Sequence, residues 1–437
     1  MKARVYLLGL LCLCSACAAP SLRYKTEVNK LVSGGKFAEA ESLVSAKQKK
    51  MYANQDYALA FLDRATLLHD AQNPAQSDHL LAQAQDRIED LYTKSATKQA
   101  GRLLINDLTA PYEVGSFERA LTYFYRAMNF LQQNQLMDAA VEARKAVFFL
   151  DQLRGSKTKG YNDDPFVQYF ASLIFESVGQ RSDARIARQN ALNAYANLGG
   201  LLKVAAPEFS VPANAAELGE VIVVHYNGLL PLKKTATIQV AWDRIMAIVS
   251  AQRENRYYSM SPEVENAINA GWMGHAVTLS YPVLEPQHYM IASSFVEAGG
   301  QTYSTQKVAD IATAAKLDLE ERMPGIWFRT ASRAVAKQIA AEQARQAARS
   351  ATNDDAWGDL AGMVVNIFGA AVEKADTRQW FTLPAEVRMT RLFLSPGEQN
   401  IRLLFRNRNG NIVGEHVFEN VAVPRGGRVF LHVRTAH

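Results

Sequence analysis

Residues 117–150 read FERALTYFYRAMNFLQQNQLMDAAVEARKAVFFL, and this stretch decides the fold of the first half of the chain. Its apolar residues recur at steps of three and four, first at Phe117, Ala120, Leu121, Phe124, Ala127, Met128 and Leu131, and then at Leu136, Ala139, Ala140, Ala143, Val147 and Leu150. This spacing places each set on one face of a helix. The polar break at residues 132–135 is short, so we expect the two helices to pack as an antiparallel hairpin.

Weaker copies of this hairpin stand on either side of it. The equivalent positions in the second helix of each copy are Ala40, Ser77, Ala139 and Ala184, which are separated by steps of 37, 62 and 45 residues. The pattern resembles the tetratricopeptide repeat (TPR), whose period is about 34 residues. Because the steps are irregular, we expect an insertion between residues 85 and 116, made of a helix over residues 87–104 and a loop through residues 109–112. Residues 21–200 are therefore predicted to form a TPR-like α-helical repeat domain.

The amino-terminal segment has the pattern of a secretory leader. Lys2 and Arg4 precede the apolar run VYLLGLLCLC, and small residues then lead to Cys17. The apolar run is too short for a permanent transmembrane helix, so residues 1–16 are predicted to be a signal peptide that is removed.

Residues 13–17, LCSAC, resemble a bacterial lipobox, although Cys14 stands where that pattern favours Leu. The resemblance implies cleavage after Ala16 and attachment of lipid, such as palmitate, to Cys17. The alternative is an ordinary secretory leader cut near residues 18–19. Ala18 follows the lipidated position, where Asp would signal retention in the inner membrane, so the resemblance implies an outer-membrane address facing the periplasm.

The length of the chain leaves room for two or three domains, and its net charge bears on whether it binds nucleic acid. The chain has 437 residues and a formal net charge of +5, which is too small to indicate nucleic-acid binding. Its three cysteines are Cys12, Cys14 and Cys17, so the mature chain can form no internal disulfide and must be stabilised by burial.

The second half changes from helical to mixed patterning. Apolar or alternating runs predict strands over residues 220–226, 235–242, 276–281 and 289–296. Residues 318–346 are predicted to be a helix interrupted near Pro324 and Gly325, and residues 360–372 a short helix packed in a core. Residues 215–375 are therefore predicted to form a mixed α/β domain.

The carboxyl-terminal segment is predicted to be β. Strands are expected over residues 386–394, 399–406, 412–418 and 428–433, separated by Pro-Gly, Asn-Gly and Gly-Gly turns. The pattern fits either a small antiparallel sandwich over residues 380–437 or an added sheet edge for the mixed domain, and the fold class is α+β. Eight arginines against four acidic residues from Pro384 onward indicate either an anionic ligand or a solvated face.

No familiar catalytic motif occurs: HExxH, GxSxG, GxGxxG and Walker loops are all absent from the sequence. The eight histidines are scattered, and His416 and His432 are the two that strands of the tail could bring near each other. Acidic pairs occur at residues 163–164, 320–321 and 354–355, of which the first is expected to cap a helix. We predict no catalytic residue, no metal and no cofactor. The less favoured alternative is a hydrolase assembled from distant residues such as Asp163 or His275.

The stretches DYALAFLDRATLLHD, LYTKSATKQAGRLLINDLTAPYEVGSFERAL, GEVIVVHYNGLLPLKK and ADTRQWFTLPAEVRMTRLFL together resemble a family of bacterial TPR-containing lipoproteins. The resemblance covers nearly all of the mature chain and implies its organisation rather than an activity. It also leads us to expect that the fold's corners are held by residues 56–57, 111–112, 117–119 and 380–384.

These observations predict a lipoprotein tethered to the outer membrane that serves as a protein-binding scaffold or adaptor in cell-envelope assembly. The predicted partner is another envelope protein, bound through the groove of the TPR-like repeats, since repeat arrays are binding surfaces more often than catalytic ones. The alternative is a regulator of peptidoglycan synthesis or a module that binds the wall itself.

Overall fold

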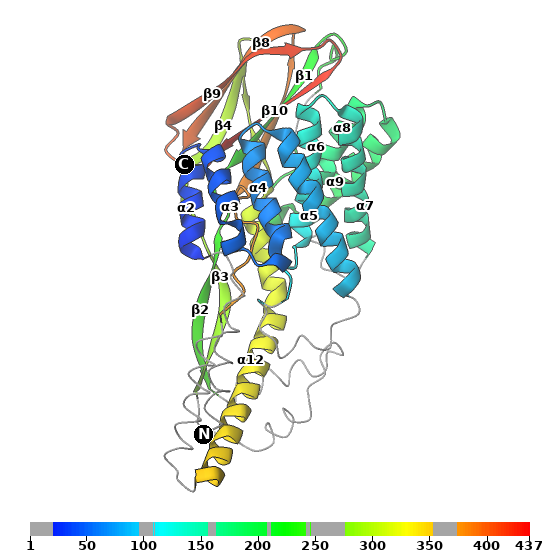
Figure 1. Cartoon of the computed structure of the whole chain (residues 1–437). Helices are drawn as coiled ribbons and strands as arrows, with labels where there is room; N and C mark the ends of the chain where they lie inside the picture. Colours follow the sequence, from blue (N-terminus) through cyan, green and yellow to red (C-terminus); the bar gives the residue numbers. More distant parts are fainter. Residues whose placement is uncertain are drawn as a thin grey trace.

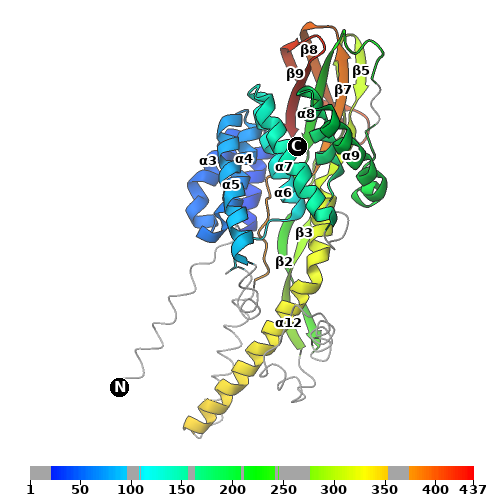
Figure 2. The same cartoon turned by 90° about the vertical axis from the view of Figure 1, so that its right-hand side faces the viewer.

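The structure is a computed structural model that describes residues 21–95, 108, 110–155, 163–207, 211–241, 245, 276–352 and 374–437. It consists of a body with a layer of helices beside β-sheets, and of an arm that projects from one end of the body (Figures 1 and 2). The amino-terminal half is helical and the rest is mixed, which confirms the predicted fold class.

Four helical hairpins form the first layer. They are α2 (Leu22–Ser33) with α3 (Phe37–Met51), α4 (Tyr57–Asp70) with α5 (Pro74–Ser95), α6 (Ser116–Gln132) with α7 (Leu136–Gly155), and α8 (Pro165–Ser177) with α9 (Arg181–Leu202). A short 3-10 helix, η2 (Asn54–Asp56), joins the first hairpin to the second. Consecutive helices pack on each other along the whole series (Figure 1).

All four hairpins use the same turn. The residues at its centre, Gly35, Gln72, Asn134 and Gly179, have left-handed backbones with φ between 58° and 75°. In each turn the next backbone N–H donates to the carbonyl five residues earlier, as from Gln135 to Phe130 at 2.8 Å. This is the Schellman arrangement, which satisfies carbonyls at a helix end. The four turns are 37, 62 and 45 residues apart, so they confirm the repeat register predicted from the sequence.

The predicted insertion helix starting at Arg87 is wrong at its start, because α5 runs without a break from Pro74 to Ser95. Leu81, Ala84 and Ile88 are all buried and keep the helical period across the expected boundary. No proline or glycine interrupts the stretch, so the second helix of this hairpin simply continues. Residues 96–104, the rest of the predicted insertion helix, lie outside the described residues.

Two four-stranded sheets make up the rest of the body. The first has the order β10 (Arg428–Thr435), β1 (Gly219–Asn227), β7 (Glu386–Leu394) and β6 (Gln306–Asp310). In it β10 is parallel to β1, and the other pairs are antiparallel. The second has the order β5 (Gln301–Ser304), β4 (Ile291–Ala298), β8 (Gly397–Asn407) and β9 (Ile412–Val423). The four carboxyl-terminal strands are thus divided between the two sheets.

The first sheet lies between the helices and the second sheet. Ile222, Val224 and Tyr226 of β1 belong to the core shared with the helices, whereas Val221 and Val223 belong to the core shared with the second sheet. Every residue of β1 is consequently buried. A strand covered on both faces needs apolar residues at nearly every position, which explains the apolar run VIVV over residues 221–224.

The arm is built from the long helix α12 (Ile311–Thr352) and a hairpin of β2 (Leu232–Ala241) and β3 (Ala276–Glu285) (Figure 1). The predicted interruption near Pro324 is wrong, because α12 continues through it for 42 residues, about 63 Å at the usual helical rise. Packing on both sides of the proline holds the helix: Arg322 pairs with Asp318 before it, and Phe328 is buried after it. Residues 360–372 lie outside the described residues.

Among the described residues, no helix combines the length and the apolar character that crossing a bilayer requires.

Candidate functional site

The first helix of each hairpin faces the sheet and a segment without regular secondary structure, residues 376–385, which we call the central segment. Figure 1 shows this segment rising behind the blue helices toward β7. This is the face of the repeats that is expected to bind a partner.

Three helices bind the backbone of the central segment through charged side chains. The Lys25 ammonium of α2 donates to the Thr377 carbonyl at 2.6 Å. The backbone N–H of Trp380 donates to Glu118 of α6 at 3.2 Å, and that of Thr382 donates to Asp63 of α4 at 3.3 Å. The helical repeats therefore hold this part of their own chain as they would hold an extended peptide.

The side chains of the central segment are anchors in the core. Trp380, Phe381 and Leu383 are completely buried. The Phe381 ring packs edge-to-face on Tyr24 with centroids 6.2 Å apart. Burying one such side chain contributes roughly 1.5–3 kcal/mol, so release of the segment would lose several times that amount. The repeat face is consequently covered by the chain itself.

Arg378 fixes the start of the central segment. Its guanidinium donates to Asp56 at 2.6 Å, to the Ala110 carbonyl at 2.7 Å and to Asp376 at 2.7 Å. Tyr112 closes the group, because its N–H donates to Asp56 at 2.9 Å.

Glu118 stands next to this group and joins three partners. It accepts hydrogen bonds from the Tyr112 hydroxyl at 2.7 Å, from the Gly115 N–H at 2.8 Å and from the Trp380 N–H. Asp56, Tyr112, Glu118 and Trp380 thus form one hydrogen-bonded group that joins η2, α6 and the central segment. All four belong to the short stretches that were expected to hold the fold together.

Burial perturbs the charged groups of this region. It lowers the pKa of Lys25 to about 7, with Asp63 acting in the opposite direction, and raises the pKa of Asp63 to about 7. Burial likewise raises the pKa of Glu118. Shifted pKa values of this kind also occur at catalytic sites, but here each group is hydrogen-bonded to the central segment. The chemistry that the arrangement supports is binding of a peptide backbone.

A pair of buried histidines lies deeper between the helices and the sheet. The rings of His69 in α4 and His432 in β10 stack with centroids 4.2 Å apart. His69 Nδ1 is 2.7 Å from Asn129 Oδ1, and burial lowers the pKa of His69 to about 4. Burial lowers the pKa of His432, and His416 lies near enough to contribute to this shift, as the sequence led us to expect. The ring stacked on His432 is nevertheless that of His69. The His416 ring packs on Phe418.

The acidic pairs have structural roles where the structure describes them. Asp164 accepts hydrogen bonds from the Phe166 and Val167 N–H groups, which confirms the predicted helix cap. Asp163 pairs with Arg154 at 2.9 Å, and Glu320 of the second pair lies 3.6 Å from Lys316. Residues 354–355, Cys17 and His275 lie outside the described residues.

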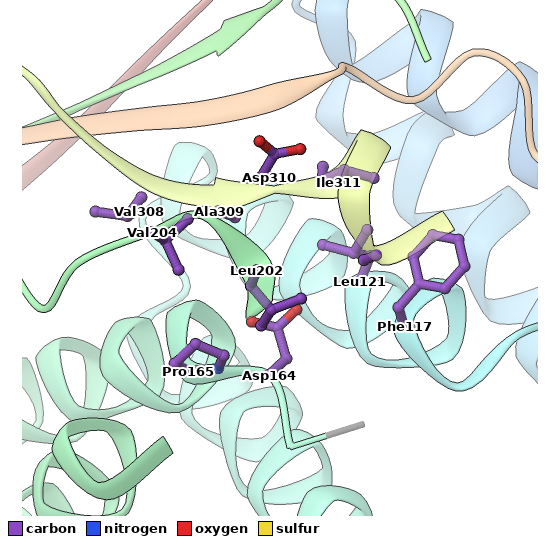
Figure 3. Close-up of a pocket in the computed structure, with 11 residues that line it drawn as sticks. Phe117, Leu121, Asp164, Pro165, Leu202, Val204, Val308, Ala309, Asp310 and Ile311 are labelled. Carbon is purple, nitrogen blue, oxygen red and sulfur yellow. The ribbon is translucent and has the colours of Figure 1, made fainter. Parts of the chain in front are cut away.

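A small cavity lies where α6, α8, β6 and the start of α12 meet, with a volume of about 20 Å³ (Figure 3). This is roughly the space of one water molecule. Asp164 and Asp310 line it from different elements, but Asp310 caps α12 through the Thr313 N–H at 2.8 Å and pairs with Lys307. Within the described ranges, no three His, Cys, Asp or Glu side chains gather closely enough to hold a metal ion.

Several arginines of the carboxyl-terminal segment pair with acidic residues of the same chain. Arg391 and Arg428 share Glu220, and Arg428 also reaches Glu176 of α8 at 2.9 Å. Arg402 bridges Glu297 and Glu415 on the second sheet. These pairs connect strands with each other and with the fourth hairpin, a role that the sequence could not distinguish from an anion-binding or solvated face.

Helix α7 exposes apolar side chains at the surface of the helical layer. Met137, Val141 and Phe148 of α7 are 64%, 45% and 64% exposed. Their spacing of four and seven residues places them on one side of the helix. We call these three residues the α7 stripe. The stripe was not predicted from the sequence. The helical period identifies the face that is buried, but it does not show that residues on the opposite face are apolar and exposed.

Comparison of the chain with models of protein families finds no match, and comparison with curated proteins finds none either.

Proposed function

We propose that this protein is a lipoprotein of the outer membrane, tethered through Cys17 and facing the periplasm, that acts as an adaptor for another envelope protein. The partner binds at the α7 stripe, through a protein surface that carries an apolar ridge flanked by charge. The observation that carries this proposal is the exposure of Met137, Val141 and Phe148 on a helix whose other face is fully packed.

Two features support an adaptor that uses its outer face. The face formed by the first helices is covered by the central segment and the first sheet, so it is not available to a partner in this conformation. Beside the stripe, the half-exposed Arg144 and Asp183 face each other at 3.7 Å, and Lys145 is also half-exposed. An apolar strip bordered by charges of both signs is typical of an interface with a protein, in which the charges supply specificity.

Site-specific photo-crosslinking in cells tests this proposal. A photoreactive residue at Met137 or Phe148 should give one strong adduct with an envelope protein, and Val141→Asp should abolish it. Met290 provides a matched control, because it is 57% exposed and apolar but lies between β3 and β4, outside the stripe. Equal adducts from Met290, or an adduct unaffected by Val141→Asp, would contradict the proposal.

Sedimentation with purified sacculi separates the adaptor from a wall-binding module. A module that binds peptidoglycan would sediment with purified sacculi in the absence of protein, and Val141→Asp would leave that sedimentation unchanged. The tether is tested separately: the chain should incorporate labelled fatty acid, and Cys17→Ser should not.

A further inference from the structure

We propose that the arm rests on the membrane to which the chain is tethered, with the distal half of α12 against anionic phospholipid headgroups. This inference rests on the lipid attachment at Cys17 in the proposed function. It adds a second membrane contact, which would fix how the body is oriented above the bilayer.

Helix α2 begins at the base of the arm. The first turn of α2 lies there, since Lys25 contacts Thr377 at the start of the central segment and α2 packs against β2. The last turn lies at the opposite end of the body, where the Ser33 hydroxyl donates to the Ala436 carbonyl at 2.9 Å. Helix α2 therefore runs away from the arm, and its amino terminus faces the side from which the arm projects (Figure 1).

The tether is much shorter than the arm. Ser21 caps α2 by accepting a hydrogen bond from the Tyr24 N–H, so the body begins there, and the four residues from Cys17 to Ser21 span at most about 14 Å. Arg322 still contacts the body, at the Glu113 carbonyl. The rest of α12, residues 323–352, extends roughly 45 Å further. A bilayer within reach of the tether must therefore meet the arm.

The arm is a packed structure rather than a lone helix. Phe328, Ala331 and Val335 of α12 are buried, and so is Leu279 of β3. The rings of Trp327 and Tyr281 lie 4.7 Å apart between the helix and the hairpin. This packing opposes folding of the arm back onto the body. We therefore infer that the arm lies along the bilayer surface.

Charge in α12 is segregated along its length. Residues 311–328 contain two basic and three acidic residues, whereas residues 329–352 contain five basic residues, of which Arg333 is buried, and one acidic residue. A basic residue close to an anionic leaflet contributes about 1 kcal/mol of attraction. The basic half is the half farthest from the body (Figure 2), which is where a bilayer surface would be met.

Vesicle sedimentation tests this contact without the lipid anchor. The probe is the chain without residues 1–16 and with Cys17→Ser, mixed with vesicles of phosphatidylglycerol and phosphatidylcholine or of phosphatidylcholine alone. We expect binding to the anionic vesicles and weak binding to the neutral ones. The triple variant Lys337→Glu, Arg345→Glu, Arg349→Glu should bind the anionic vesicles roughly 100-fold more weakly.

A matched triple variant controls for overall charge. Lys36→Glu, Arg181→Glu, Arg185→Glu reverses three exposed basic residues at the other end of the helical layer, and it should bind as the parent does. Equal weakening in both triples, or no preference for anionic vesicles, would overturn the proposal. Acylation of the full-length chain is measured separately. If the chain is acylated but the probe does not bind vesicles, the arm contact is refuted and the tether is not. If the full-length chain is never acylated in cells, the tether is refuted. Vesicle binding by the probe then loses the geometric reason given for it.

Discussion

The indole Nε1 of Trp380 donates a 2.8 Å hydrogen bond to the Thr66 hydroxyl, although 314 positions separate the two residues along the chain. Through this bond and the burial around it, the helical repeats and the sheets share one core. The helical layer is therefore part of a single body, in which the central segment fills the face that a free repeat array would offer to a ligand.

Replacing Trp380 should destabilise the whole body. Trp380→Ala leaves a large cavity in the shared core and should lower the free energy of unfolding by about 3–5 kcal/mol. Trp380→Phe keeps most of the ring but loses the hydrogen bond and should cost less. Urea unfolding monitored by circular dichroism measures both. An alanine variant as stable as the phenylalanine variant would show that the segment is not a core element.

Asp56 and Arg378 should be strongly coupled in a double-mutant cycle. Both side chains are almost completely buried, so removing Arg378 leaves the Asp56 carboxylate without its cation and should cost about 3–5 kcal/mol. Removing Asp56 leaves Arg378 paired with Asp376 and should cost less. The double variant Asp56→Asn, Arg378→Met should cost clearly less than the sum of the single variants. The exposed pair of Arg402 and Glu415 is the control, and its cycle should show far weaker coupling. Strict additivity at Asp56 and Arg378 would contradict the structural account.

Acid should weaken the fold through its buried histidines. The folded-state pKa of His69 is about 4 against an ordinary value of 6.5, because burial disfavours the charged ring. As pH falls below 6.5 the unfolded chain binds a proton that the folded chain rejects, so stability is lost between pH 6.5 and about 4. Between pH 7 and pH 5 this amounts to roughly 2 kcal/mol for His69.

His69→Asn tests this dependence, measured as the free energy of unfolding at the two pH values. The variant should lose less stability on acidification than the parent, whatever its stability at pH 7. The control His79→Asn changes an exposed histidine and should keep the parent's dependence. An unchanged dependence in His69→Asn would rule out this residue as its source.

Gly228 should tolerate a methyl group poorly. Its backbone is left-handed with φ 73°, and a Cβ would lie 2.5 Å from the Tyr289 ring. Gly410 has a similar φ of 83° but nothing within 4 Å of the added atom. Gly410→Ala therefore measures backbone strain alone, of order 1–2 kcal/mol, and Gly228→Ala should cost more. Thermal unfolding compares the two, and equal costs would mean that Tyr289 moves aside freely.

Local sequence patterns predict the hairpins and most of the strands. The positions of the left-handed turn residues agree with the repeat steps because each hairpin is specified by its own apolar period and its own short turn. Predictions of the same kind were wrong at Arg87, where a new helix was expected to start, and at Pro324, where a helix was expected to be interrupted. A polar stretch and a proline are usual signs of a break, but α5 keeps a buried face through the first, and packing on both sides carries α12 through the second.

Sequence alone determined the helical repeats, because each hairpin follows from the spacing of apolar residues within a short stretch. The expected lipoprotein leader and the residues expected to hold the fold together rest on resemblance to known families. Tertiary structure alone decided that residues 376–385 occupy the face of the repeats, that His432 stacks on His69 and that α7 keeps an exposed apolar stripe. These depend on which distant segments meet, and the energy of such contacts lies in burial and hydrogen bonds between residues that no local pattern connects.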